Sequence, residues 1–312
     1  MTTVLITGGT GMIGKALSKL LLQKGYAVIV LTRTLPAQKT APIIGFSYAL
    51  WDVARQTIDI GAVQKADYIV HLAGAGVADK RWTTNRKKEI ITSRTNSSEL
   101  LVKTLKENSN HVNAVISASA IGWYGADPSI PNAHPFTETN PADNSFLGET
   151  CRLWEESIDP VEQLGKRLVK LRTGIVLSKE GGALNEFIKP LRSGIAAILG
   201  NGKQVVSWLH IDDMCRMYLQ AIEDGNMEGV YNAAAPKPIS NKELTLHLAK
   251  AMRGKFYIPV YVPGFVLKII LGELSTEVLK SATVSAEKIR KTGFNFIYPS
   301  IDAAINQLLG NN

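Results

Sequence analysis

A glycine ladder near the start of the chain constrains its fold most strongly. The stretch VLITGGTGMIGKAL, residues 4–17, places glycines at positions 8, 11 and 14 between a short apolar run and an amphipathic segment. Val4–Thr7 is typical of a buried strand, and Met12–Gln23 carries an apolar stripe at helical spacing, formed by Ile13, Leu17, Leu20 and Leu21. Gly25 is placed to end this helix, and Ala27–Leu31 predicts a second strand. The chain therefore begins with a strand–turn–helix–strand unit.

Each glycine of the ladder has its own use in such a unit. The backbone N–H groups at a helix N-terminus can bind a pyrophosphate. Gly8 allows the tight turn, Gly11 lets the backbone approach the phosphates, and Gly14 lets the helix pack closely on the strand. The spacing predicts a dinucleotide site, and the alternative is a glycine turn with a purely structural role.

The end of the second strand indicates which dinucleotide is bound. A carboxylate at this point would bind the ribose 2′-hydroxyl of NAD. The chain instead reads Leu31-Thr32-Arg33-Thr34, and the planar cation of Arg33 suits a 2′-phosphate. We therefore predict NADP as the cofactor. The alternative is that Arg33 is a solvated surface side chain.

The same alternation of strand and helix continues through the N-terminal half. Strands are expected at residues 46–51, which lead to Asp52, and at 68–72, 114–118 and 168–173, with a helix over 96–106. Strands that alternate with helices predict a parallel sheet covered on both faces. Ligands of such sheets bind at the carboxyl ends of the strands. The small residues Ala73–Gly76, after the strand at 68–72, would let a flat ring or a ribose lie against the backbone.

Composition places the chain among ordinary globular proteins. Of its 312 residues, 45% are hydrophobic and 20% are charged, and the net charge of +8 favours anionic ligands without establishing a nucleic-acid function. Cys151 and Cys215 are too few for a disulfide framework or a zinc site. The apolar run 265–271 contains Lys268 and is too short to span a bilayer, and we expect no signal peptide before the first strand. We expect a cytoplasmic protein with no metal site.

Several motifs resemble one known superfamily. TGGTGMIG resembles the TGxxGxxG fingerprint of the extended short-chain dehydrogenase/reductases, the group of sugar-nucleotide epimerases and dehydratases. The segments SASAIGWYG, LWEES, SWLHIDDMCRMYLQAI and GVYNAAAPKPISNKEL follow in the order expected of that group. The segments ADKRW, PGFVLKIILGE and GFNFIYPSIDAAINQLL narrow the resemblance to its atypical, epimerase-like, NADP-binding branch with a small C-terminal domain of unknown function. Members of this branch are described as nucleoside-diphosphate-sugar epimerases, and some as cell-division inhibitors.

The resemblance implies an architecture, a cofactor and a substrate class. It implies a Rossmann-type doubly wound parallel sheet formed by residues 1–175 and 205–235, with a smaller, partly interleaved C-terminal lobe formed by 176–204 and 236–312. The cofactor would be NADP and the substrate a carbonyl compound or a sugar nucleotide, with a homodimer as the assembly and no membrane or specific nucleic-acid partner. The cofactor-binding residues that it implies are Thr7, Gly8, Thr10, Gly11, Met12, Ile13, Gly14, Thr32, Arg33, Trp51, Asp52, Leu72, Ala73, Gly74 and Arg152.

The catalytic residues of the superfamily are only partly present. Its reaction uses a serine after the fifth strand and a YxxxK pair, in which the lysine lowers the pKa of the tyrosine from about 10. Ser119, or Ser117, matches the serine. The pair should follow NPADNS, but one register has Phe146 and Thr150 and the other has Leu147 and Cys151. Neither register supplies a phenol or an amine.

Two nearby residues are candidates to replace the missing pair. Tyr124 could bring a phenol to the same pocket, although packing or substrate contact is the alternative. Arg152 could act as a cation near the ribose, or it could be a surface side chain on the helix 146–158.

Other polar groups have structural alternatives. His71 at a strand end suits a buried core position, and the aspartates of the WLHIDD segment suit helix capping, although His210 with Asp212 and Asp213 resembles a proton relay. The basic run Lys80, Arg81, Arg86, Lys87, Lys88 and Arg94 could bind phosphates or form the wet face of a helix.

Two functions follow from these residues. One is an NADP-dependent oxidoreductase or epimerase with altered acid–base residues. The other is a module that binds NADP(H) without turnover.

Overall fold

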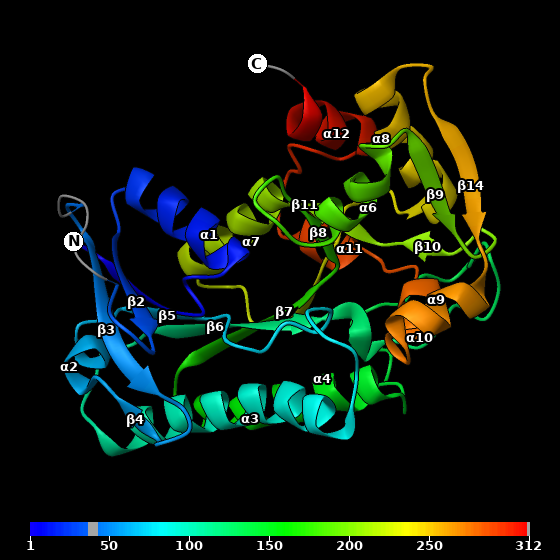
Figure 1. The fold of residues 1–312 in the computed structure, drawn as a ribbon. Coiled ribbons are helices and arrows are strands. Elements are labelled where there is room, and N and C mark those ends of the chain that lie inside the picture. Colours follow the sequence, from blue (N-terminus) through cyan, green and yellow to red (C-terminus); the bar gives the residue numbers. More distant parts are fainter. Residues whose placement is uncertain (37–42, 311–312) are drawn as a thin grey trace.

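The structure, a computed structural model, describes residues 1–36 and 43–310. A sheet of eight strands crosses its centre (Figure 1). Its strands are β1 (Thr3–Thr7), β2 (Ala27–Thr32), β3 (Phe46–Asp52), β4 (Thr57–Ile58), β5 (Tyr68–His71), β6 (Ala114–Ala120), β7 (Arg167–Thr173) and β12 (Gly229–Ala233). They lie in the order β12-β7-β6-β5-β1-β2-β3-β4, and every neighbouring pair is parallel except β3 with β4.

The strand order reverses at β1. This strand pairs with β2 on one side, where Val4 faces Val28, and with β5 on the other, where Val4 faces Tyr68. The order β3-β2-β1-β5-β6-β7 is that of a doubly wound Rossmann sheet. The fold class expected from the sequence is confirmed. In such a sheet the ligand crevice lies at the carboxyl ends of the strands beside the reversal, here β1 and β5.

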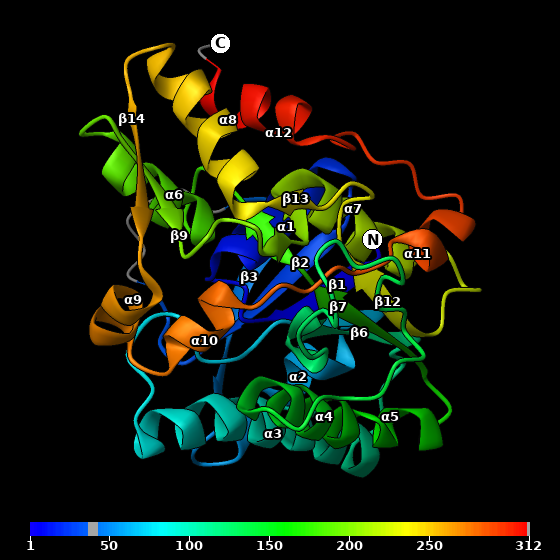
Figure 2. The same cartoon turned by 90° about the vertical axis from the view of Figure 1, so that its right-hand side faces the viewer.

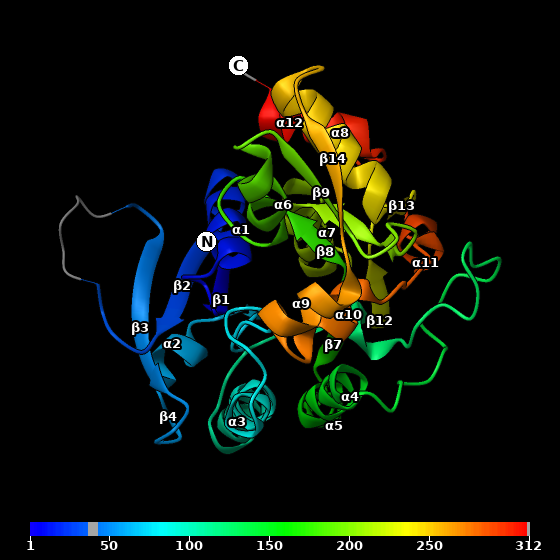
Figure 3. The same cartoon turned by 45° about the vertical axis from the view of Figure 1, so that its right-hand side comes forward.

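Helices cover both faces of the sheet, because its strands are apolar on both sides. Val4 and Ile6 face one apolar cluster and Leu5 faces the other. On the first face α1 (Met12–Gln23) packs against α7 (Ile211–Glu223) (Figure 1). The second face carries α2 (Ile60–Gln64), α3 (Thr84–Glu107), α4 (Phe146–Ile158) and α5 (Pro160–Gln163), and Figure 3 shows α3 and α4 side by side beneath the sheet. The bounds predicted for α1 and α4 are those observed.

Helix α3 is longer than the sequence pattern predicted. It begins at Thr84 instead of Asn96, and the hydroxyl of Thr83 accepts a hydrogen bond from the backbone N–H of Arg86 at 3.2 Å. The buried stripe of its first half holds Arg86, Ile90 and Arg94. Because two of these three inward positions are charged, the apolar periodicity that marks a helix is absent there.

The remaining elements form a smaller lobe above the first face of the sheet (Figure 2). Three pairs of short strands belong to it, namely β8 (Ile175–Leu177) with β11 (Trp208–His210), β10 (Val205–Val206) with β13 (Ile239–Ser240), and β9 (Ile195–Leu199) with β14 (Ile258–Val262). Its helices are α6 (Ala183–Leu191), α8 (Asn241–Arg253), α9 (Gly264–Leu271), α10 (Leu274–Leu279), α11 (Glu287–Lys291) and α12 (Ile301–Leu309). The chain leaves the sheet after β7 and returns to it at β12, so the lobe is interleaved with the sheet.

Two contacts hold the lobe to the sheet and its helices. The buried carboxylate of Asp213 on α7 accepts hydrogen bonds from the backbone N–H groups of Ile297 and Tyr298, both at 2.9 Å. At the other end, Leu274 of α10 packs with Trp82 and Ile90 in an apolar cluster that joins the start of α3 to the lobe. No helix in the described ranges is long and apolar enough to cross a membrane.

Candidate functional site

The glycine ladder forms a tight turn between β1 and α1. Gly8 has φ +65°, a left-handed conformation that favours glycine, and a Cβ there would lie 2.8 Å from the carbonyl carbon of Leu72. A Cβ at Gly14 would lie 2.5 Å from Cα of Gly9, so Gly14 lets the first turn of the helix pack on the glycine turn itself and not on the strand. At Gly11 a Cβ would meet only the carbonyl oxygen of Gly8, at 3.3 Å. Its outer side is open.

The start of α1 has the properties of an anion site. Gly11 is its N-cap residue, no side chain caps it, and its first turn holds no acidic residue. The first N–H groups of a helix lack intrahelical partners, and the helix dipole favours a negative charge beside them. Thr10 and Gly11 are exposed and Met12 and Ile13 are half-buried, so this helix end is open to a ligand.

Thr7 fixes the two strands on either side of the reversal. Its hydroxyl oxygen accepts hydrogen bonds from the backbone N–H groups of Leu72 and Ala73, at 3.0 and 3.1 Å, and lies 2.8 Å from Nδ1 of His71. Burial, together with the nearby charge of Arg94, lowers the pKa of His71 to about 3, so the ring is neutral. Its Nε2 lies 3.2 Å from the hydroxyl of Ser98. His71 is therefore a hydrogen-bonded core residue with no free nitrogen for catalysis.

The residues expected around the adenosine half lie at the ends of β2 and β3. Arg33 follows β2 and is exposed, and the hydroxyl of Thr32 donates to the carbonyl of Thr34 at 2.9 Å. Trp51 is buried, whereas Asp52 accepts hydrogen bonds from the backbone N–H groups of the turn that follows β3. All of them lie at the same edge of the sheet as the glycine turn.

Beside the glycine turn, a Cβ at Gly182, before α6, would lie 3.2 Å from the sulfur of Met12. Gly182 borders the site and had no signal in the sequence.

Ser119 and Tyr124 lie together in a buried ionic network. Ser119 donates to Oε1 of Glu155 at 2.7 Å, and the same carboxylate accepts from Nε and Nη2 of Arg172, at 2.8 and 3.0 Å. Nη1 of Arg172 donates to the hydroxyl of Tyr124 at 3.0 Å, and this hydroxyl donates to Oδ1 of Asn232 at 2.7 Å.

Neither hydroxyl of this network faces an open cleft. Tyr124 has no exposed surface and Ser119 is 2% exposed. Burial raises the pKa of the Tyr124 phenol, although Arg172 acts in the opposite direction. The network joins β6, β7, β12 and α4, so it ties together the strand ends behind the candidate site.

Helix α4 contains neither tyrosine nor lysine, and its inward face shows which of the two registers lies at the strand ends. A Cβ at Gly122, just after β6, would lie 3.2 Å from Cβ of Leu147 and 3.6 Å from the sulfur of Cys151. Phe146 points elsewhere and packs edge-on against Trp82, with ring centroids 4.8 Å apart. Leu147 and Cys151 therefore face the end of β6, and burial raises the pKa of the Cys151 thiol to about 12.

The basic side chains of this region divide into two groups. Arg152 lies on the outer side of α4 and is bound to Glu149 and Glu156, so the geometry favours its surface alternative. In the run 80–94, Lys80, Arg81 and Lys88 are exposed, whereas Arg86 and Arg94 are 7% and 8% exposed. Nη1 of Arg94 donates to the carbonyls of Ala75 and Ile90, at 3.0 and 2.8 Å. Burial lowers the pKa of Arg94 to about 10.

His210 takes the capping role that the sequence suggested for the aspartates after it. Its Nδ1 accepts from the backbone N–H of Asp212 at 3.1 Å, and its Nε2 lies 2.9 Å from Oε1 of Gln307. Burial lowers the pKa of His210. Asp213 instead binds the backbone at Ile297 and Tyr298, so these residues connect elements and form no proton relay.

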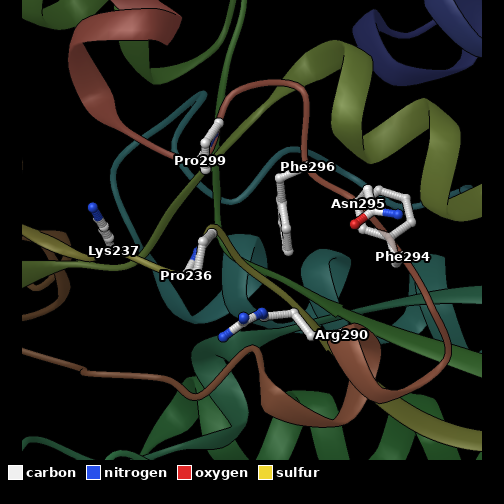
Figure 4. Close-up of a pocket in the computed structure, with 7 residues that line it drawn as sticks. All are labelled: Pro236, Lys237, Arg290, Phe294, Asn295, Phe296 and Pro299. Carbon is white, nitrogen blue, oxygen red and sulfur yellow. The ribbon is translucent and has the colours of Figure 1, made fainter.

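Two surface hollows lie away from the glycine turn. One, of about 390 Å³, is lined by Pro236, Lys237, Arg290, Phe294, Asn295, Phe296 and Pro299, and Figure 4 shows Phe296 and Arg290 converging beside Pro236. The other lies against Thr3, Ala27 and Phe46, at the amino ends of β1, β2 and β3. Since ligands of doubly wound sheets bind at the carboxyl ends, neither hollow marks the site.

The fold and the glycine turn define a protein of the Rossmann type. Residues 4–234 match the NAD dependent epimerase/dehydratase family, and residues 262–308 match the domain of unknown function DUF1731. The chain belongs to this epimerase/dehydratase family. An epimerase family protein of Staphylococcus aureus (strain MRSA252) is 34% identical over 309 residues, and one of Staphylococcus haemolyticus is 35% identical over 312 residues, with 99% of both chains covered in each comparison.

Solved structures resemble the whole chain. Human epimerase family protein SDR39U1 (isoform 2), solved with NADPH, is 27% identical with a TM-score of 0.85, and both chains are covered fully. The nucleoside-diphosphate sugar epimerase of Corynebacterium glutamicum is 32% identical with a TM-score of 0.77, over 99% of this chain and 58% of that one. A UDP-glucuronic acid 4-epimerase of Bacillus cereus, in complex with UDP-glucuronic acid and NAD, shares the fold at 19% identity and a TM-score of 0.80.

Proposed function

We propose that the chain binds NADP(H) at the carboxyl edge of β1 and β5, with the pyrophosphate on the first turn of α1 and the 2′-phosphate on Arg33. The observation that carries this proposal is the uncapped start of α1 behind Gly8 and Gly11. Similarity to the human protein solved with NADPH supports the choice of cofactor. Arg33 follows β2 where an acid would favour NAD, and a guanidinium suits a phosphate.

The reaction class that fits this site is hydride transfer between the nicotinamide and a carbonyl compound or sugar nucleotide. When bound, the cofactor would supply the hydride chemistry, and this chain would supply binding and orientation. General acid–base assistance contributes about 10²- to 10⁴-fold in enzymes. The hydroxyls of Ser119 and Tyr124 are enclosed, and Leu147 and Cys151 occupy the inner face of α4. We therefore expect this chain to turn over slowly compared with other members of its family.

The same enclosure favours a second candidate, a module that holds NADP(H) without turnover. Single-turnover hydride transfer, followed by NADPH absorbance over a panel of carbonyl compounds and sugar nucleotides, separates the two. Slow oxidation of NADPH by a carbonyl compound, or slow reduction of NADP⁺ by a sugar nucleotide, supports the enzyme, and no change across the panel supports the module. Rapid turnover that survives Tyr124→Phe would contradict both, since another residue would then move the proton.

Cofactor binding is tested at Gly11. A Cβ at this position meets little of the protein, so Gly11→Val should fold, but the branched side chain would occupy the space proposed for the pyrophosphate. Calorimetric titration with NADPH should show no binding, while circular dichroism stays that of the unmodified protein. Gly225→Val is the matched control, because a Cβ at Gly225 meets no atom within 4 Å and lies far from the glycine turn in sequence. Unchanged NADPH binding by the Gly11 variant would place the phosphates elsewhere.

A further inference from the structure

Arg94 is a buried cation without a carboxylate partner. Four lysine and arginine side chains are buried in the described part of the chain, and Arg86, Lys170 and Arg172 each lie within 4.0 Å of a carboxylate. Arg94 has no ion pair there, and the nearest aromatic face, that of Trp154, lies 4.8 Å from its Cζ. An uncompensated charge in a low-dielectric environment is costly, so its retention calls for a counter-charge.

The guanidinium of Arg94 also has an unoccupied edge. Its two hydrogen bonds both come from Nη1, which leaves Nε and Nη2 without a described acceptor. In Arg172 and Arg152 this same edge, Nε with Nη2, holds a glutamate through two parallel hydrogen bonds. Neither atom of Arg94 is among the buried atoms that lack a partner, so both keep contact with solvent. The edge is a fork shaped for a carboxylate or a phosphate.

The fork lies beside the proposed cofactor site. A Cβ at Gly74 would lie 3.0 Å from Cζ and 3.3 Å from Nε of Arg94, so the guanidinium rests against the backbone of this exposed glycine. Two residues earlier, the backbone at Leu72 is the one that Gly8 of the glycine turn touches. Nε1 of Trp154, whose ring faces the guanidinium of Arg94, is buried without an acceptor.

We propose that the Nε/Nη2 edge of Arg94 binds a diphosphate oxygen pair of the bound ligand at the carboxyl end of β5. This inference rests on the proposed function and adds a residue to it. The diphosphate could be the pyrophosphate of the dinucleotide or that of a nucleoside-diphosphate substrate. Both present the same planar pair of oxygens to the fork. Gly74 is then required to be small, because a side chain there would cover the guanidinium.

The test measures binding of NADPH, 2′,5′-ADP and UDP by calorimetry to three variants. Arg94→Met removes the fork and leaves no carboxylate unpaired, Arg94→Lys keeps the charge without the fork, and Lys88→Met changes an exposed residue of the same helix as the control. Hydrogen bonds between charged groups are worth about ten- to hundredfold in affinity, which is the loss expected for Arg94→Met. Arg94→Lys should recover only part of it. The melting temperature of unliganded Arg94→Met should be unchanged or higher, since an uncompensated charge has gone.

The three ligands separate the sources of the diphosphate. Weaker NADPH binding with unchanged 2′,5′-ADP binding, which lacks a diphosphate, assigns the fork to the cofactor. Weaker UDP binding with unchanged NADPH binding assigns it to the substrate. Unchanged affinities for all three ligands overturn the role of Arg94 and leave the proposed function intact. Equal weakening of all three, with a lower melting temperature, also overturns it, because Arg94 would then only support the loop at Ala75. An unmodified protein that binds neither NADPH nor 2′,5′-ADP refutes the proposed function, and if it does not bind UDP either, the Arg94 proposal fails with it.

Discussion

Replacement of Arg172 by methionine should lower the free energy of unfolding by much more than the loss of the hydrogen bonds that Arg172 donates would suggest. The guanidinium of Arg172 is 2% exposed and the carboxylate of Glu155 is 5% exposed, and Nε and Nη2 hold that carboxylate at 2.8 and 3.0 Å. In Arg172→Met the Glu155 carboxylate stays buried with only Ser119 as a donor. Breaking a buried pair from one side costs about 3–5 kcal/mol, which is a large part of the stability of a typical domain, about 5–15 kcal/mol.

The double variant Arg172→Met/Glu155→Leu isolates the cause. With both charges gone, the remaining cost is that of the hydrogen bonds lost by Ser119, Tyr124 and the carbonyl of Glu138, about 1–3 kcal/mol. The double variant should therefore be more stable than Arg172→Met alone. Urea unfolding of Arg172→Met, Glu155→Leu and the double variant, followed by circular dichroism, gives the three free energies and the coupling between the two residues.

Arg152 supplies a matched control, because it holds Glu149 through the same Nε/Nη2 fork at 2.9 and 2.5 Å on the exposed side of α4. Arg152→Met should have no measurable effect, since exposed ion pairs are screened by solvent. Equal losses in Arg152→Met and Arg172→Met would refute the argument from burial. A double variant whose loss is the sum of the losses in Arg172→Met and Glu155→Leu would refute the pairing.

Four further outcomes follow from the same structure. Arg33→Ala should weaken NADPH binding about ten- to hundredfold, as for a hydrogen bond to a charged group, and leave NADH binding unchanged in calorimetry; equal losses would remove Arg33 from the choice of cofactor. The pKa of His71 falls from 6.5 to about 3 on folding, so its contribution is complete above pH 6.5 and is lost as the pH falls toward 3. Urea unfolding of His71→Gln should show a shallower decline below pH 6.5, by at most about 1.4 kcal/mol per pH unit, and an unchanged slope would mean that His71 is protonated in the native state. Gly14→Ala should destabilise the chain by about 1–3 kcal/mol and weaken NADPH binding, since its Cβ would lie 2.5 Å from Cα of Gly9; a neutral effect would show that the turn adapts. Tyr124→Phe should cost about 1–3 kcal/mol in urea unfolding because the Asn232 amide oxygen and Nη1 of Arg172 lose a partner, and a neutral effect would show that the hydroxyl is not part of the network.

Local patterns in the sequence predicted the parts of the fold that local patterns determine. The glycine turn, the apolar stripe of α1 and the apolar run of β2 each specify one element without help from distant residues, and all were predicted. Helix α3 shows the limit. Its inward positions include Arg86 and Arg94, which are buried because carbonyls, carboxylates and the ring of Trp154 lie opposite them in the folded chain. The ring of Trp154 belongs to another helix, α4, and lies outside any local sequence window.

The same limit applies to the candidate site. The glycines of the turn between β1 and α1 could be located from spacing alone, because the backbone conformation requires them. The inward or outward direction of a basic side chain could not, so Arg152 and Arg94 were equally plausible cations until the structure placed one outside α4 and the other against Gly74. The network of Ser119, Glu155 and Arg172 joins residues up to 53 positions apart, from Ser119 to Arg172, and depends on the order of the strands.

The hydrogen bonds between Asp213 and the backbone at Ile297 and Tyr298 limit where the chain can be truncated, both in the laboratory and in evolution. The epimerase/dehydratase match ends at residue 234, after the last strand of the central sheet, so a fragment ending there would keep every strand of that eight-stranded sheet. It would nevertheless lose both N–H donors to a carboxylate that has no exposed surface in the full chain, together with the apolar side chains of α8 and α12 that complete the core above α7. We expect such a fragment to aggregate. The C-terminal segment is therefore not an independent domain that can be removed or transferred. A lineage that lost it would need substitutions in α7 that replace the buried carboxylate of Asp213 and the exposed apolar side chains.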